Sequence, residues 1–193
     1  GLIDTQSALN ASFAADMPAP GNIAFFSQSG ALCTSILDWA ANECIGFSKF
    51  ISMGNKTDID EVALIKAIEN DASTKIVLVY LEGVKNGTEF ISTAKELTKK
   101  KPMIVVKSGG TTAGAKAASS HTGTLAGSEN AFDAAFKQSG ILRAKTIEEL
   151  FDYARIFSFQ QLPRGPHIAL ITNAGGPGII AADAVERSKL KMA

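Results

Sequence analysis

His121, one of only two histidines in this 193-residue chain, lies in a run of small residues, Ser119-Ser120-His121-Thr122-Gly123-Thr124-Leu125-Ala126-Gly127. Because no bulky side chain fills the space around it, backbone N–H groups and a phosphate can approach the imidazole closely. The run therefore predicts a nucleophile site, with Thr122 and Gly123 as candidate phosphate-binding residues beside it. The alternative is a histidine that only hydrogen-bonds its own turn.

Glu82 is the candidate partner of this histidine. It follows the apolar run 76–81 and precedes Gly83. A carboxylate at the end of a buried strand can accept the second ring N–H of His121, which would fix the tautomer and leave the other nitrogen nucleophilic. A solvated charge or a cap at the strand end is the alternative.

Small and polar residues also follow other apolar runs. Ser29-Gly30 opens a helix-like segment, where a phosphate could receive backbone and hydroxyl hydrogen bonds, although small residues after a strand also serve close packing. Asn55 and Lys56, and the segment 107–110, could likewise contact an anion. Ordinary turn chemistry explains both of these segments equally well.

The elements that must position these residues are repeated βα units, since short apolar runs alternate with helix-like segments. We expect strands near 22–27, 47–53, 75–81, 103–107 and 141–142, and helices near 30–42, 59–70, 87–100, 129–139 and 147–158. Together they predict an α/β, flavodoxin-like, doubly wound fold with five parallel strands in the order 2-1-3-4-5. Ligands of such sheets gather at the carboxyl ends of the strands.

Residues 160–166 are rich in Pro and Gly and predict a linker. Beyond it, a strand pattern at 167–172 and a helix reaching about residue 187 echo the segment 23–30. We therefore expect a lead-in between domains at 1–20, a flavodoxin-like domain at 21–159 and the truncated start of a second, similar domain at 167–193. The chain is expected to be a fragment of a longer polypeptide.

Composition excludes several classes of function. Nineteen basic and nineteen acidic residues cancel, so neither nucleic acid nor anionic lipid is an expected partner. The apolar runs are too short to cross a bilayer and there is no signal pattern, so a cytoplasmic location is expected. Cys33 and Cys44 lack CxxC spacing, and no metal site is predicted.

Seven motifs, in order along nearly the whole chain, resemble the NDP-forming acyl-CoA synthetases. They are SQSGAL (27–32), SMGNKTDIDE (52–61), YLEG (80–83), KPMIVVKSGG (101–110), SSHTGTLAG (119–127), EELFD (148–152) and TNAGGPG (172–178). This family includes ADP-forming acetate–CoA ligase, whose alpha-subunit region is the part resembled, and succinyl-CoA ligase is a more distant relative.

The resemblance implies that His121 is phosphorylated during turnover and that Glu82 orients it. It also implies that the helix N-termini at Ser29-Gly30 and at Gly175-Gly176 face the phosphohistidine from two domains. The implied reaction reversibly interconverts acyl-CoA, ADP and phosphate with a carboxylic acid, CoA and ATP, through an acyl phosphate.

The resemblance further implies a CoA-binding domain and an ATP-grasp domain or subunit as partners, and an oligomer in the full protein. Neither domain fits within these 193 residues, so the fragment alone should be inactive. Mg²⁺ is expected with the nucleotide, and no cofactor is expected to be tightly bound. The sequence does not reveal the acyl group or whether ADP or GDP is the acceptor. Nor does it reveal whether the parent protein is one chain or two subunits.

Two other functions compete with this interpretation. One is a non-catalytic, acyl-CoA-sensing regulatory module of an acetyltransferase fusion, which would have no need of the nucleophile His121. The other is a receiver or FMN protein, which requires an aspartate cluster or flavin-stacking aromatic residues at the strand ends; neither is found in the sequence.

Overall fold

The computed structural model describes residues 1–110, 128–188 and 190–193. Its strands are β1 (Leu2–Asp4), β2 (Leu9–Ala11), β3 (Pro20–Ser27), β4 (Phe47–Ser52), β5 (Ile76–Leu81), β6 (Met103–Lys107), β7 (Leu142–Ala144), β8 (His167–Ile168) and β9 (Lys191–Met192). Its helices are α1 (Gly30–Asn42), α2 (Glu61–Glu69), α3 (Gly87–Thr98), α5 (Glu129–Ser139), α6 (Ile147–Phe159) and α7 (Gly175–Arg187). The chain divides into two units, Gly1–Phe159 and Gln160–Ala193.

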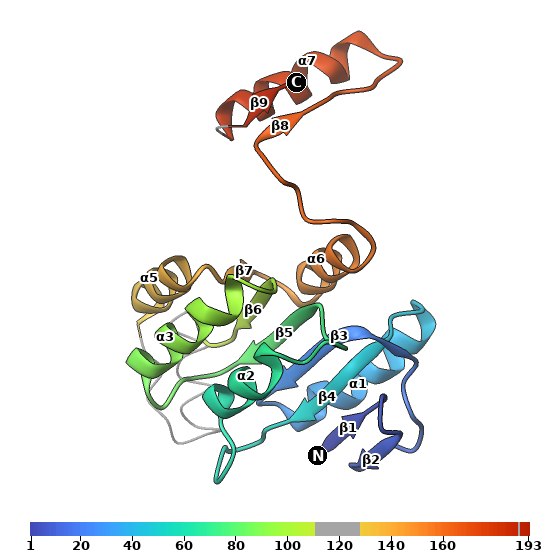
Figure 1. Ribbon diagram of the computed structural model, residues 1–193, viewed down its shortest axis with the longest axis vertical. Coiled ribbons are helices and arrows are strands. Elements are labelled where there is room, and N and C mark those ends of the chain that lie inside the picture. The colour runs from blue at the N-terminus through green and yellow to red at the C-terminus, as the bar shows by residue number, and fades with distance from the viewer. Residues whose placement is uncertain (111–127, 189) are drawn as a thin grey trace. The chain divides into compact units, whose positions relative to one another are not determined.

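The first unit is built on a seven-stranded sheet with the order β2-β1-β4-β3-β5-β6-β7 (Figure 1). The strands β4, β3, β5, β6 and β7 are parallel. Numbered along the chain, these five strands have the order 2-1-3-4-5. The predicted flavodoxin-like arrangement is therefore confirmed, and the parallel strand β3 lies between β4 and β5.

Residues 1–20, expected as a lead-in, contribute two strands that the sequence pattern did not predict. β1 pairs antiparallel with both β2 and β4 and extends the sheet past the five expected strands. The Thr5 hydroxyl donates to the Phe47 carbonyl at 2.7 Å and holds the end of β1 against β4. Each new strand has only three residues, which is too short for alternation to be recognised.

Successive side chains of a strand point to opposite faces of the sheet. The apolar side chains of the sheet therefore form two layers, one on each face. Phe25 belongs to the layer covered by α1 and α6. Its neighbour Phe26 belongs to the layer covered by α2, α3 and α5, and Figure 1 shows these helices on one face of the sheet. The sheet is thus buried on both faces, which explains why its strands are nearly continuous apolar runs.

Side chains of Asp60 and Thr146 cap the starts of two helices. Asp60 caps α2 by accepting a hydrogen bond from the Ala63 N–H at 3.0 Å. Thr146 accepts from the Glu149 N–H at 3.1 Å, and the Glu149 carboxylate accepts from the Lys145 N–H at 2.7 Å. Both arrangements satisfy N–H groups that have no partner inside the helix.

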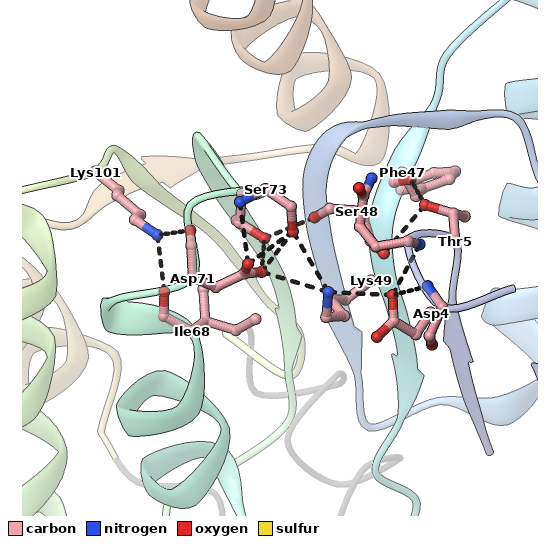
Figure 2. Close-up of polar contacts among 12 residues, drawn as sticks. Asp4, Thr5, Phe47, Ser48, Lys49, Ile68, Asp71, Ser73 and Lys101 are labelled. Carbon is pink, nitrogen blue, oxygen red and sulfur yellow. Dashed lines mark hydrogen bonds and ion pairs between the residues drawn. The ribbon is translucent and has the colours of Figure 1, made fainter. Parts of the chain in front are cut away.

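A polar network, the amino-edge cluster, joins strands near the amino ends of β4 and β5 (Figure 2). Lys49 Nζ lies 3.2 Å from Asp4 Oδ1 and 3.5 Å from Asp71 Oδ2. Asp71 also accepts hydrogen bonds from the hydroxyls of Ser73 and Thr74, each at 2.7 Å. Burial raises the pKa of Asp71, but these hydrogen bonds and the charge of Lys49 outweigh it and lower the pKa to about 2.

The second unit contains one βαβ unit, in which β8 pairs parallel with β9 across α7. The predicted helix reaching residue 187 is confirmed. The predicted strand 167–172 is too long, because only His167–Ile168 is paired. A strand extends only as far as it is paired with a neighbouring strand. The partner of β8 is β9, which has two residues. No helix in the described part of the chain has the length and apolar character needed to span a bilayer.

Candidate functional site

The carboxyl ends of β3 and β5 bring two of the predicted site segments together. These strands are neighbours, with Ser27 in register with Tyr80. β3 continues into α1, which packs on one face, whereas β5 continues into α3 on the opposite face. The segments that follow Ser27 and Leu81 therefore diverge at a topological switch point, where open α/β sheets bind their ligands.

Two hydrogen bonds hold the turn Ser29-Gly30, which leaves the start of α1 exposed to solvent. Ser29 Oγ accepts a hydrogen bond from the Leu32 N–H at 3.3 Å, and its own N–H donates to Ser27 Oγ at 3.0 Å. Gly30 is exposed, and a Cβ atom there would find its nearest neighbour, Ser52 Oγ, at 3.8 Å. Among the described residues, Gly30 thus leaves space for a Cβ-sized group beside the positive end of the helix.

Glu82 is attached to this turn through the side chain of Gln28. Gln28 Oε1 accepts hydrogen bonds from the N–H groups of Glu82, at 2.7 Å, and Gly83, at 3.1 Å. Gln28 Nε2 donates to the Gly83 carbonyl at 2.9 Å. The structure therefore brings the predicted carboxylate Glu82 and the predicted phosphate-binding turn to one edge of the sheet.

The Gly83 carbonyl has a second donor, Lys56 Nζ, at 2.7 Å. Lys56 follows β4 and also pairs with Glu61 Oε2 at 3.1 Å. The exposed fractions of the two side chains are 11% and 1%, so the charge of Lys56 is balanced inside the protein. Lys56 was predicted only as a residue that could contact an anion. In the structure it stabilises the loop after β5 by donating to the Gly83 carbonyl.

Lys107, at the end of β6, adds a cation to the same edge. It lies opposite Leu81 in the sheet, donates to the Ser108 carbonyl, and its Nζ lies 4.7 Å from the centre of the Phe132 ring. Burial lowers the pKa of Lys107, the positive charge of Arg143 lowers it further, and the negative charge of Glu82 opposes both. The charges of Glu82 and Lys107 thus influence each other.

The remaining predicted residues belong to two other segments of the chain. His121, Thr122 and Gly123 fall outside the residues that the structure describes. Gly175 and Gly176 are exposed and open α7 in the second unit, where added Cβ atoms would meet no described residue within 4 Å. Within residues 1–110, 128–188 and 190–193, no group of three or more His, Cys, Asp or Glu side chains is arranged to hold a metal ion.

Sequence reasoning missed Gln28 and Glu61. The signal for Gln28 was present, because a polar amide directly follows the apolar strand 22–27, yet its side chain is only 9% exposed. Such a residue must find hydrogen-bond partners inside the protein. Glu61 had no comparable signal, since an acidic residue in the first turn of a helix is common on the surface.

Comparison with known proteins gives consistent matches. A family model of the succinyl-CoA ligase-like flavodoxin domain matches residues 20–157. The chain is 48% identical to the alpha subunit of ADP-forming acetate–CoA ligase I of Pyrococcus furiosus, over all of this chain and 42% of the subunit. It is 46% identical to the ADP-forming 4-hydroxybutyrate–CoA ligase of Nitrosopumilus maritimus, over 99% of this chain and 28% of that ligase.

A solved structure supports the same relationship. The acetyl-coenzyme A synthetase 1 of Candidatus Korarchaeum cryptofilum, in complex with phosphate and ADP, matches with a TM-score of 0.90 and 40% identity. The match covers all of this chain and 42% of that protein. This chain therefore spans less than half of the length of each of these relatives.

Proposed function

Since this chain belongs to the family of succinyl-CoA ligase-like flavodoxin domains, we propose that it is the phosphohistidine-bearing part of an NDP-forming acyl-CoA synthetase. The observation that carries the proposal is the attachment of Glu82 to the turn that opens α1. It holds a carboxylate and a helix N-terminus at one edge of the sheet. A phosphorylated imidazole needs both, an acceptor for its ring N–H and donors for its phosphate.

In the proposed reaction, a ring nitrogen of His121 attacks the phosphorus of an acyl phosphate. The new N–P bond forms as the P–O bond to the acyl group breaks, and the carboxylate leaves. Near pH 7 an imidazole is largely neutral, so it needs no prior deprotonation. ADP then takes the phosphoryl group from His121 and yields ATP, and every step is reversible.

The chain's own residues position the phosphoryl group and its carrier. Glu82 accepts the second ring N–H and stabilises the positive charge that the ring gains on phosphorylation. The α1 terminus at Ser29-Gly30 donates to the phosphate oxygens. We assign Thr122 and Gly123, and the α7 terminus at Gly175-Gly176, to the same task. Phosphoryl transfer depends mainly on such positioning and electrostatic stabilisation.

The other substrates would be bound by partner domains or subunits. Relatives of this chain are longer proteins or subunits, and we propose a CoA-binding domain and an ATP-grasp domain or subunit that holds the nucleotide with Mg²⁺, in an oligomer. The two relatives named for acetate and 4-hydroxybutyrate are 48% and 46% identical to this chain. Similarity over this region therefore does not identify the carboxylic acid.

Labelling of the histidine tests the proposal. The complete protein, with its nucleotide-binding part, is incubated with Mg²⁺ and ATP labelled in the γ-phosphate. We expect a protein-bound label that is acid-labile and alkali-stable, absent in His121→Ala and retained in the control His167→Ala. Glu82→Gln should label about 10- to 100-fold more slowly, because the ring is no longer oriented.

Unchanged labelling in His121→Ala would refute the proposal. Binding of acyl-CoA without any ATP-dependent label in the unaltered protein would instead favour a regulatory module. A normal labelling rate in Glu82→Gln would remove Glu82 from the mechanism.

A further inference from the structure

Gln28 occupies the point where the chain segments after β3 and β5 diverge. Up to Ser27 and Tyr80 the two strands are paired, and the Gln28 N–H makes one more bond, to the Tyr80 carbonyl at 3.2 Å. Beyond this point β3 turns away into α1. The segment that contains Glu82 and Gly83 then has no continuation of β3 beside it.

The carboxamide of Gln28 replaces that strand. Its oxygen accepts from the N–H groups of Glu82 and Gly83, and its nitrogen donates to the Gly83 carbonyl. The side chain is only 9% exposed, so water competes little for these bonds. The carboxamide suits this place because it accepts and donates in one plane.

We propose that Gln28 is a positioning residue for Glu82, which fixes the carboxylate relative to the N-terminus of α1. This inference rests on the proposed function, because it is the proposed phosphohistidine that needs both groups at a set distance. In this proposal Gln28 is not a catalytic residue. It acts by holding the backbone of Glu82 and Gly83, so its loss should slow phosphoryl transfer only as long as residue 82 is a glutamate.

A double-mutant cycle in the complete protein tests this dependence. The rate of phosphohistidine formation from ATP is measured by rapid quenching for Gln28→Met, Glu82→Gln and the double variant. We expect Gln28→Met to be about 10- to 100-fold slower than the unaltered protein, because small displacements of catalytic groups are costly. In the Glu82→Gln background the same change should cost no more than about twofold.

Two further variants separate positioning from folding. Gln28→Asn keeps the carboxamide but shortens its reach by about 1.5 Å, so it should fold and still label slowly. Ser48→Ala removes a buried hydrogen bond of 2.7 Å to Thr74 near the amino ends of the strands. It should lower thermal stability to an extent similar to Gln28→Met, yet label at the normal rate.

Each outcome decides between the two proposals. Normal labelling in both Gln28→Met and Gln28→Asn overturns the role of Gln28, and so does a full additional loss in the Glu82→Gln background. Neither result affects the proposed function if Glu82→Gln alone is slow. Failure of the unaltered protein to form phosphohistidine refutes the proposed function instead.

Discussion

Lys56 and Glu61 form an ion pair that is almost removed from water, with exposed side-chain fractions of 11% and 1%. Lys56 also adopts a positive φ of 54°, which is uncommon for a residue with a side chain. The pair and the bond from Lys56 to the Gly83 carbonyl hold this backbone in place. The loop after β4 therefore supports the loop that carries Glu82.

We expect Lys56→Met to lower the free energy of unfolding by about 3 kcal/mol, because it leaves the Glu61 carboxylate buried without a counter-charge. Chemical denaturation of the variant measures this loss. The double variant Lys56→Met/Glu61→Gln should recover part of the stability, since no buried charge remains. A double variant less stable than Lys56→Met alone would contradict the explanation.

At this scale the sequence predicts residues by the chemistry they could perform on a ligand. The position of Glu82 at the carboxyl end of β5 could be predicted because a carboxylate directly follows an apolar strand. The polar residue Gln28 after β3 was a signal too, but the partners of Gln28 and Lys56 could not be predicted, because both contact the backbone at Gly83, 55 and 27 positions away. Such contacts depend on which strands become neighbours, and the residue types alone do not specify them.

At the scale of elements, the end of α1 shows a helix stop without glycine. Cys44 adopts φ 55°, and the Ile45 N–H donates to the Ala40 carbonyl at 2.9 Å. This is the hydrogen bond of a Schellman motif, in which the left-handed residue is usually glycine. The exposed Cys44 is therefore strained, because it has a Cβ atom. At the end of α5 the corresponding residue is Gly140, at φ 72°, which has none.

We expect Cys44→Gly to raise the free energy of unfolding by about 0.5–1 kcal/mol. Relief of the left-handed strain exceeds the entropy that glycine adds to the unfolded chain. Chemical denaturation measures the gain. Cys44→Ala is the matched control, because it keeps the Cβ atom and should give no gain; an equal gain in both variants would assign the effect to the thiol.

The long parallel elements could be predicted, whereas β1 and β2 could not, and the strand that contains β8 was predicted too long. The strands β3 to β6 and the helices around them carry clear apolar patterns, and the expected order of five strands is confirmed. The strands β1 and β2 have three residues each, and β8 has two. Such short strands exist only because a partner strand lies beside them, so no local pattern predicts their ends.

At the scale of the whole molecule, the amino and carboxyl ends of the parallel strands in the main sheet have different roles. The carboxyl edge holds the candidate site. The amino-edge cluster joins β1, β4 and the segment before β5 through the contacts of Lys49 and Asp71. Since these segments are distant in sequence, the cluster stabilises the fold as a unit, and its charges make this stability dependent on pH.

We expect stability to fall as the pH is lowered from about 4 towards 2. The pKa of Asp71 is lowered from 3.8 to about 2 on folding, so its contribution is complete above pH 4 and is lost as the folded carboxylate takes up a proton. The loss should be about 1–2 kcal/mol, allowing for partial exposure to solvent. Urea unfolding at a series of pH values measures it.

Asp71→Asn should remove this part of the pH dependence, so that the difference from the unaltered protein shrinks towards pH 2. The exposed Asp38 provides the matched control, and Asp38→Asn should leave the pH profile unchanged. Equal profiles for the unaltered protein and Asp71→Asn would contradict the assignment.

The glycines beside the candidate site are not needed by the packing of the protein. Among the described residues, an added methyl group at Gly83 would meet nothing within 4 Å, and one at Gly30 would meet only Ser52 Oγ, at 3.8 Å. Neither glycine is therefore required by the packing of the described residues. Larger side chains at both positions are compatible with that packing.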